Sequence, residues 1–341
     1  MRHSMLQVSR CISLLISLLW VSPRLQAQSD VMLTQYWAVP AYYNPAAAGD
    51  TDNLRIRGGM RAQWTGIDNA PRTFVAGADA PFRMFDKRWG AGIAVQRQSC
   101  GPLRNLTAGL QLGYKHKALG EELTVALQAG LLNEQFKGSE VSVPDDGEQR
   151  SEYESMPDYD VDGNALDLGV GIHYSHPRFK AGISLMHANS PAVTFGGVDG
   201  VDGAADASAD AGDAAEKNCQ IKVPRTLYFS AEGNIRVKNT LFEIIPSVLI
   251  RSDFTFTDAA ATARVRYNGK FSAGIGYRYR DALSVMLGAE FRGIFIGYSY
   301  DHHLRGIAKT SSGSHEIFAG YNLKLDFSEK NRYRHKSIRI M

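Results

Sequence analysis

Four polar residues that lie close together in the sequence are of the types that hydrolases use: Asp167, His173, Ser184 and His187. A serine hydrolase needs a serine whose proton passes to a histidine, and a carboxylate that orients that histidine. Ser184 lies in neither Gly-x-Ser-x-Gly nor Ser-x-x-Lys, and the order of the residues does not suggest a triad. We therefore expect these side chains to line a polar interior, and we predict that the protein is not an enzyme.

A run of acidic residues resembles part of a calcium site. Asp158, Asp160 and Asp162, followed by Gly163, match the first half of a calcium-binding loop. The twelfth position of such a loop carries a glutamate that binds calcium through both oxygens, and here that position is Gly169. Because outer loops are often acidic, we predict no cofactor and keep a weak Ca²⁺ site at the three aspartates as the alternative.

The triplet Asp301-His302-His303 contains residue types that bind zinc. Neighbouring residues of an extended chain point to opposite faces, so two ligands from this triplet would need a bent backbone. We expect the polar end of a strand here and no metal site.

Arginines are concentrated on one face of a predicted strand at residues 54–64. Charged side chains are costly in lipid or in a dry core unless they are paired. They suit a water-filled lumen, or a buried network with carboxylates from other strands, for which Glu290 and Glu316 are candidates. The arginines of this face are Arg55, Arg57 and Arg61. The basic residues that we predict to face the lumen are Arg55, Arg57, Arg264 and Arg266.

The elements that must position these side chains are β-strands. Residues 271–301 form three runs in which apolar or aromatic residues alternate with small or polar ones, joined by short turns. Because a strand turns successive side chains to opposite faces, this pattern predicts an antiparallel meander with one apolar face. The same period recurs along residues 54–327 and predicts about fourteen strands. A soluble barrel or sandwich would bury the apolar face, whereas an outer-membrane barrel would turn it toward lipid.

The lengths of the connections distinguish these two architectures. The long connections are the fifth, seventh and thirteenth (residues 137–163, 189–224 and 302–314), and the even-numbered connections are short. Single-chain outer-membrane barrels have an even number of strands, short periplasmic turns and long outer loops. The sequence therefore predicts a transmembrane antiparallel β-barrel with both termini in the periplasm.

The ends of the chain add the predicted localisation. A basic start, an apolar run over residues 11–21 and the small-residue site Leu25-Gln26-Ala27 predict a signal peptide at residues 1–27. No later apolar run is long enough for a membrane helix. Residues 28–53, which Pro and Gly interrupt, are predicted to be an irregular or plug segment, and residues 328–341 a basic periplasmic tail. The net charge of +3 over 341 residues does not favour a nucleic-acid partner.

Two cysteines remain after the predicted signal peptide, Cys100 and Cys219, both in predicted loops on the same side. They could pair in an oxidising compartment, but spacing alone does not determine their distance. A disulfide and two free thiols both stay open.

Several motifs resemble the PorP/SprF family. The motifs near the start are Gln35-Tyr36, Asn44-Pro45-Ala46-Ala47-Ala48-Gly49, Arg61-Ala62-Gln63-Trp64-Thr65-Gly66-Ile67 and Ala70-Pro71-Arg72-Thr73. The motifs near the end are Gly297-Tyr298-Ser299-Tyr300-Asp301 and Gly313-Ser314-His315-Glu316-Ile317, with Tyr321 after them. The resemblance covers almost the whole chain after the signal peptide, although the acidic insertion around residues 196–216 is unlike the compact family pattern.

The resemblance implies an outer-membrane barrel of Bacteroidetes that belongs to the type IX secretion system. It implies association with periplasmic ring components, and a role in secretion or surface attachment of adhesins, gliding-motility proteins or proteases with a C-terminal sorting domain. It brings no catalytic residues. The residues that match the family motif, to which we assign a structural or partner-docking role, are Asn44, Pro45, Gly49, Arg61, Gln63, Trp64 and Pro71.

We weigh three functions. The first is a non-enzymatic secretion component that anchors periplasmic ring components or docks cargo. The second is a porin or solute channel with an arginine-lined lumen, which single-channel conductance would reveal. The third, an outer-membrane enzyme, would lose activity when an inward His or Ser is replaced.

Overall fold

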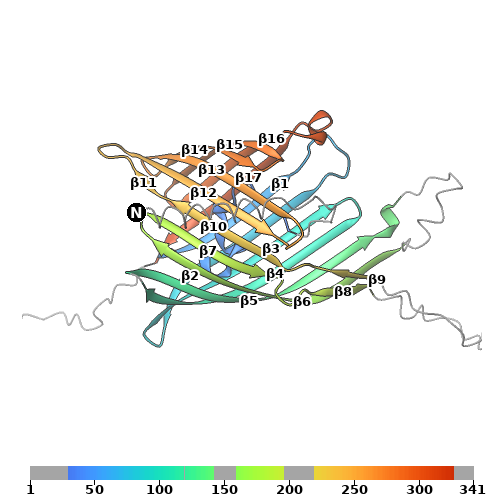
Figure 1. The fold of residues 1–341 in the computed structure, drawn as a ribbon, viewed down its shortest axis with the longest axis horizontal. Coiled ribbons are helices and arrows are strands. Elements are labelled where there is room, and N and C mark those ends of the chain that lie inside the picture. The colour runs from blue at the N-terminus through green and yellow to red at the C-terminus, as the bar shows by residue number, and fades with distance from the viewer. Residues whose placement is uncertain (1–29, 119, 142–158, 196–218, 326–341) are drawn as a thin grey trace, which may run out of the picture.

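The computed structural model describes residues 30–118, 120–141, 159–195 and 219–325, and these form an antiparallel β-barrel (Figure 1). Fourteen strands close it, because β1 pairs with β17 and β10 pairs with both β7 and β12. The strands are β1 (Asn53–Ala62), β2 (Arg72–Met84), β3 (Lys87–Cys100), β4 (Leu103–Ala118), β5 (Glu121–Lys137), β6 (Asp160–His176), β7 (Phe179–Met186), β10 (Thr226–Gly233), β12 (Phe242–Ser252), β13 (Thr257–Tyr267), β14 (Phe271–Arg278), β15 (Ala282–Phe291), β16 (Ile294–His303) and β17 (Ser314–Lys324). The predicted fold class is confirmed.

Three further strands are not among the fourteen that close the barrel. β11 (Ile235–Arg236) continues β10 beyond Asn234 and pairs with the same strand, β12. β8 (Ala192–Phe195) and β9 (Cys219–Lys222) form a separate two-stranded sheet inside the connection that we predicted as a loop over residues 189–224. Val193, Phe195 and Val223 bury their side chains against Leu132, which gives this sheet its own small apolar core.

Apolar side chains face out of the barrel and polar ones face in. On β4, Leu110 is 66% exposed, whereas the next residue, Gln111, is 3% exposed. On β15, Leu283, Val285 and Leu287 are exposed, and Ser284 is buried. This is the arrangement of a barrel whose outer surface lies in lipid.

Outward-facing aromatic residues lie near both ends of the barrel. The ring pairs Trp89–Tyr114 and Phe242–Tyr267 lie at one end, with centroids 5.1 Å and 4.9 Å apart. Near the other end, Tyr300 packs on His315 at 5.3 Å. Aromatic residues in these places are typical of the two boundaries between lipid and water.

The two ends of the barrel differ in their connections. At the end that we call the turn end, short turns join β2 to β3, β4 to β5, β6 to β7, β13 to β14 and β15 to β16. The opposite loop end carries the β8–β9 sheet and the connection with η4 (Gly306–Lys309), which Figure 1 shows on one side of the barrel. Strands β4 to β6 have 16 to 17 residues, whereas β14 has 8, so the wall is taller on one side.

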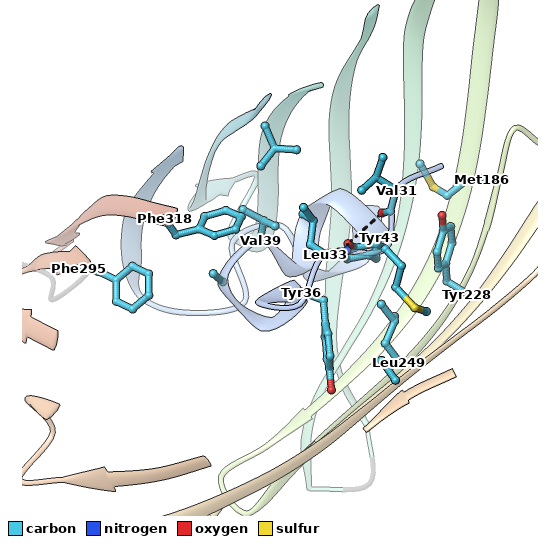
Figure 2. Packing of buried hydrophobic residues seen from close by; sticks show 14 residues of the cluster. Val31, Leu33, Tyr36, Val39, Tyr43, Met186, Tyr228, Leu249, Phe295 and Phe318 are labelled. Atoms are coloured by element: carbon cyan, nitrogen blue, oxygen red, sulfur yellow. Dashed lines mark hydrogen bonds between the residues drawn. The ribbon is translucent and has the colours of Figure 1, made fainter. Parts of the chain in front are cut away.

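Residues 30–52, which we call the plug, lie inside the barrel (Figure 2). They contain the short helices η1 (Tyr36–Ala38), α2 (Pro40–Tyr43) and η2 (Pro45–Ala47). Leu33, Tyr36 and Tyr43 pack with Tyr228 and Leu249 of the barrel wall to make the main apolar cluster. The core of this protein is therefore the contact between the plug and the wall.

Several predicted boundaries shift. β1 ends at Ala62, so Gln63 and Trp64 belong to the β1–β2 loop and not to the strand. β5 and β6 extend into the predicted loop 137–163, and β16 and β17 extend into 302–314. β17 ends at Lys324, and the predicted signal peptide and basic tail lie outside the described residues. No helix among the described residues is long and apolar enough to cross a membrane.

Candidate functional site

The plug runs along the lumen from the loop end to the turn end. Asp30 lies beside His187 and Tyr228, which stand where β7 ends and β10 begins, at the loop end. Asp50 pairs with Lys180, the second residue of β7, at the turn end. The described part of the plug therefore begins at the loop end and ends at the turn end, while both termini of the chain lie outside the described residues.

An ion cluster fastens the plug at the loop end. Arg61 of β1 pairs with Asp301 of β16 at 2.7 Å and with Glu316 of β17 at 3.1 Å, and all three residues are 1% exposed. Arg278 of β14 also contacts Asp301, at 3.4 Å. The Arg61 cluster consists of Arg61, Arg278, Asp301 and Glu316.

The plug supplies hydrogen bonds to the centre of this cluster. The hydroxyl of Thr34 donates to the Asp301 carboxylate at 2.7 Å and accepts from Arg61 at 2.9 Å. The backbone N–H groups of Thr34 and Gln35 donate to Glu316, at 2.9 Å and 2.7 Å. Buried charges are tolerated where their hydrogen bonds are satisfied, so wall and plug stabilise each other here.

A second cluster holds Asp30. The ring of His187 lies between Asp167 (Nδ1 to Oδ1, 2.8 Å) and Asp30 (Nε2 to Oδ1, 3.1 Å). The hydroxyl of Tyr228 donates to Asp30 at 2.6 Å, and Arg251 donates to the Asp30 carbonyl. The His187 cluster therefore consists of Asp30, Asp167, His187, Tyr228 and Arg251.

The carboxylate form of Asp30 and the imidazolium form of His187 are both favoured. Burial raises the pKa of Asp30, but the charge of His187 and hydrogen bonds from His187 and Tyr228 outweigh it and lower the pKa to about 2. His187 follows the last residue of β7. Burial lowers its pKa, but the charge of Asp30 and the hydrogen bonds to Asp167 and Asp30 raise it to about 10. As an imidazolium held by two carboxylates, His187 fixes Asp30 in place and has no free nitrogen to act as a catalytic base.

The four residues that resembled a hydrolase do not form one. Asp167 and His187 pair, but the Ser184 hydroxyl donates to the Tyr43 carbonyl of the plug at 2.5 Å. His173 lies near Asp50, at 3.7 Å. Ser184 is thus bound to backbone and is not in line with a histidine base.

Glycines of the wall let the plug backbone and Asn44 approach closely. The Asn44 amide donates to the Ile172 carbonyl at 3.0 Å and covers Gly171, where a Cβ would lie 2.1 Å from the Asn44 Oδ1. A Cβ on Gly90 of β3 would lie 2.1 Å from the Ala48 carbonyl oxygen. Gly90 accepts no side chain while the plug backbone is in place, and a side chain at Gly171 would displace the Asn44 amide, which gives a tertiary reason for glycine at both positions.

The last turn of the plug is tied to β1 and β2. Arg55 pairs with Asp79 at 2.8 Å and donates to the Ala47 carbonyl at 3.0 Å. Asp79 accepts from the Gly49 N–H at 2.8 Å, and Gly49 has a positive φ of 66°. Burial raises the pKa of Asp50, but Lys180, His173 and Arg55 outweigh it and hold that pKa well below its usual range.

Beyond the plug, a cavity of about 750 Å³ lies at the turn end. We call it the vestibule. Plug residues Trp37, Ala38 and Asp50–Asp52 line one side of it. The charged wall residues that line it are Arg55, Arg57, Arg88, Lys117, Glu121, Glu122, Lys180, Glu232, Arg264, Arg266, Lys270 and Glu290.

The structure places all four predicted lumen arginines at this cavity. The guanidinium of Arg264 lies 3.8 Å from the centroid of the Trp37 ring, and Arg266 pairs with Glu243. Arg57 lies over Phe295, at 5.1 Å, and donates to Asn322 at 2.7 Å. Of the two suggested acidic partners, Glu316 pairs with Arg61, and Glu290 accepts from Asn322 rather than from an arginine.

The remaining family-motif residues lie in the second half of the plug and in the β1–β2 loop. Pro45 is the first residue of η2, which Asn44 caps by accepting from the Ala46 N–H at 2.9 Å. Gln63 donates from its N–H to the Pro71 carbonyl at 3.0 Å. The Trp64 N–H donates to Ser314 at 3.0 Å and its ring lies near His303.

The proposed metal and disulfide positions are only partly described. Asp158 lies outside the described residues, Asp160 accepts hydrogen bonds from Lys137 and Ser139, and Asp160–Gly163 belong to β6. No group of three or more His, Cys, Asp or Glu that could hold a metal occurs in the described part of the chain. His302 is exposed while His303 is buried, so that pair does point apart. Cys100 is exposed and free, and the side chain of Cys219 lies outside the description.

Sequence reasoning did not find several of the residues that hold the plug: Asp30, Thr34, Asp79, Tyr228, Arg251 and Arg278. It treated Asp301 only as part of the polar end of a strand. Asp301 and Arg278 were visible as polar residues on the alternating strands. The signal that would have found them is a carboxylate or arginine on the small-residue face at the loop end of a strand. Sequence alone does not say which strand ends meet.

Comparison with known families gives one match. The model for the type IX secretion system membrane protein PorP/SprF matches residues 25–321. No curated protein sequence matches the chain.

Solved structures give distant likenesses. The toluene transporter TbuX of Ralstonia pickettii has 12% identity and a TM-score of 0.47, over 84% of this chain and 93% of that one. Omp33, an outer membrane protein of Acinetobacter baumannii, has 7% identity and a TM-score of 0.43, over 80% and 98%. The toluene transporter TodX of Pseudomonas putida has 12% identity and a TM-score of 0.45, over 87% and 95%. At these TM-scores we draw nothing from them, and the strand pairing establishes the barrel.

Proposed function

The chain belongs to the PorP/SprF family of type IX secretion system membrane proteins, and from this premise we propose that it is a closed, non-enzymatic docking barrel of the outer membrane. In this proposal it anchors periplasmic ring components of the secretion system, or docks cargo with a C-terminal sorting domain. It is thereby needed for secretion or surface attachment of that cargo.

The observation that carries the proposal is the burial of the plug. Leu33, Gln35 and Ala46 are at most 1% exposed inside the lumen. Thr34 and Asp30 are bound by charged groups of β1, β16, β17 and the ends of β7 and β12, and by the Tyr228 hydroxyl of β10. A solute channel needs a continuous water path, whereas a docking barrel does not. The filled lumen supports the docking role.

The turn end is the side that we assign to the periplasm, because single-chain barrels have short periplasmic turns and long outer loops. The vestibule then opens toward the periplasm, and its charged rim contains Arg88, Lys117 and Lys270. A rim of both charge signs suits a protein partner, since charge patterns select partners and orient them.

The alternative is a porin or solute channel. The vestibule supports this alternative, because a cavity of about 750 Å³ already lies at one end of the lumen. Conduction would require the plug to leave both the Arg61 cluster and the His187 cluster.

Conductance in planar bilayers separates the two functions. Full-length protein is compared with a variant that lacks residues 30–48. We expect the full-length barrel to be silent and the deletion variant to conduct. A stable open pore from the full-length protein would establish the channel and overturn the docking proposal.

Site-specific crosslinking tests the docking surface. A photoreactive residue at Lys270, in the turn between β13 and β14, should capture periplasmic ring components or sorting-domain cargo in cells. The matched control is a photoreactive residue at Leu304, an exposed position at the loop end. Deleting the gene should cause proteins with C-terminal sorting domains to disappear from the surface and medium by mass spectrometry. If their export continues, the proposed role fails.

A further inference from the structure

Three arginines point out of the barrel from neighbouring strands near the loop end: Arg72 of β2, Arg97 of β3 and Arg104 of β4. Arg72 pairs in register with Ser99, and Ser99 pairs with Arg104, so Arg72 and Arg104 lie in one row across the strands with Ser99 between them. Arg97 lies two residues from Ser99 on the same face. Phe74, which pairs with Arg97, is 50% exposed, so this face looks outward.

The spacing of the strands brings these side chains within reach of one small anion. Neighbouring strands lie about 4.8 Å apart, so Arg72 and Arg104, two strands apart, are separated by about 10 Å at their backbones. Arg97 lies diagonally below both of them. Guanidinium groups bind phosphate through two parallel hydrogen bonds, so arginines at this spacing suit a phosphate group.

A pocket lies over this row. It has a volume of about 280 Å³, and Arg72, Ser99 and Arg104 line it together with Ala62, which pairs in register with Arg72. The β1–β2 loop contributes the amide side chains of Gln63 and Asn69 to the same pocket. The site is thus a hollow on the outer wall, separate from the vestibule and the plug.

Two of the three charges have no partner within the described part of the chain. No ion pair or hydrogen bond joins the side chains of Arg72 or Arg97 to described residues. Arg104 is different, because it contacts Glu140 at 3.0 Å and the Gly101 carbonyl. Two unpaired cations beside an apolar surface are a site for an anion supplied from outside the protein.

The wall below the pocket is apolar. In the two register rows below Arg97, the outward residues Gly58, Ala76, Ala78 and Ala108 are small. Larger apolar residues of the outer face stand above, beside and between them, namely Met60, Phe74, Ile93, Val95, Leu106 and Leu110. On β5 the rows that contain Arg97 and Arg104 reach Asn133 and Gln135. The arginines therefore stand where the outward surface changes from apolar to polar.

We propose that this hollow binds a glycolipid with a phosphorylated headgroup, of the lipid A class, from the leaflet at the loop end. The phosphate lies between Arg72 and Arg97 at the edge of the pocket, which Arg72 lines, and an acyl chain lies on the apolar wall over Ala76 and Ala78. A soluble acidic peptide would use the arginines but leave the apolar wall below them uncovered, so lipid is the occupant that both features support. Assigning that leaflet to the cell exterior rests on the orientation proposed above, but binding itself does not.

Native mass spectrometry of the full chain in neutral detergent tests the site, with bisphosphorylated lipid A as the probe. The double variant Arg72→Gln, Arg97→Gln should bind about 25-fold more weakly, since each basic side chain near anionic lipid contributes about fivefold. The control Arg292→Gln removes an exposed arginine at the turn end and should leave binding unchanged. Ala76→Trp, which adds a bulky side chain to the apolar wall below the arginines without changing charge, should also weaken binding.

Three outcomes would overturn the proposal. The double variant binds lipid A as tightly as the unaltered chain, or lipid A stripped of its phosphates binds equally well, or inorganic phosphate at the same concentration displaces the lipid. Resistance of the barrel to unfolding in dodecyl sulfate without heating shows that each variant is folded. If the double variant misfolds, Ala76→Trp and the dephosphorylated lipid still decide the question. Because the assay needs neither orientation nor secretion, its failure leaves the docking role standing.

Discussion

The plug is held in different ways at its two ends. At the loop end, Thr34 and Asp30 are bound by two clusters whose charged groups are almost entirely withdrawn from water. At the turn end, Arg55 and Asp79 bind the backbone of Ala47 and Gly49. Beyond them Asp50 meets Lys180, whose side chain is 33% exposed, and the chain then borders an open cavity. The same segment is thus sealed into the wall on one side and accessible on the other.

The difference follows from how much water each charge retains. A buried charge that loses its partner cannot recover its hydration, so breaking the loop-end clusters is costly. A partly exposed charge at the vestibule is solvated again by water, so the same loss there costs little. If the turn end faces the periplasm, a periplasmic partner can reach the Asp50 end of the plug without disturbing the Arg61 and His187 clusters.

The largest effect is expected from Arg61→Ala. It leaves Asp301 and Glu316 buried without their main cation, which costs about 3–5 kcal/mol. We expect a lower midpoint of urea unfolding in detergent and the appearance of conductance as the plug loosens. If Arg61→Ala were no more destabilising than Arg88→Ala, which removes a partly exposed arginine at the turn end, the proposed difference between the two ends of the plug would be wrong.

A side chain at Gly90 should loosen the plug in its middle. In Gly90→Val the new Cβ would overlap the Ala48 carbonyl, and overpacking of this kind costs about 1–3 kcal/mol. We expect conductance to rise while the Arg61 cluster stays intact. The control is Gly58→Ala on β1, where the nearest atom to an added Cβ is 3.9 Å away, and this variant should stay silent.

The His187 cluster should make the loop-end fastening depend on pH. The pKa of His187 is raised from 6.5 to about 10, so its contribution to stability is complete below pH 6.5 and is lost as the pH rises through 10. The pKa of Asp30 is lowered from 3.8 to about 2, so its contribution is complete above pH 3.8 and is lost as the pH falls through 2.

Urea unfolding followed by tryptophan fluorescence at pH 6, 8 and 10 measures this dependence. Stability should decline across that range in the unaltered chain and much less in His187→Gln. Equal declines in the two proteins would assign the pH dependence to other groups.

The smallest effect is expected from Arg88→Ala at the turn end. Arg88, whose side chain is 37% exposed, forms ion pairs with Asp52 and Glu122, and partly exposed pairs of this kind contribute at most about 1 kcal/mol each. The loss should shrink further in 1 M salt, because exposed charges are screened. A large effect on unfolding would show that the turn end is held as tightly as the loop end. A loss of crosslinking to periplasmic partners without loss of stability would instead point to the rim as the docking surface.

Much of the barrel was predictable because its signal is local. Alternation between Leu110 and Gln111, or between Val285 and Ser284, can be read from adjacent residues. The even strand number and the long odd connections follow from the same reading. The β8–β9 sheet was missed because its strands have 4 residues each and lie on either side of the acidic insertion.

The sequence by itself determined the outward apolar face, the strand number, the inward arginines and the family motifs. Only the tertiary structure decided which carboxylates meet Arg61 and in which direction the plug runs. Arg61 and Asp301 are 240 residues apart in the chain, and they meet because β17 closes the barrel between β1 and β16. Alternation repeats every two residues, whereas a contact across the closure depends on the register of every strand between, and no local pattern carries that information.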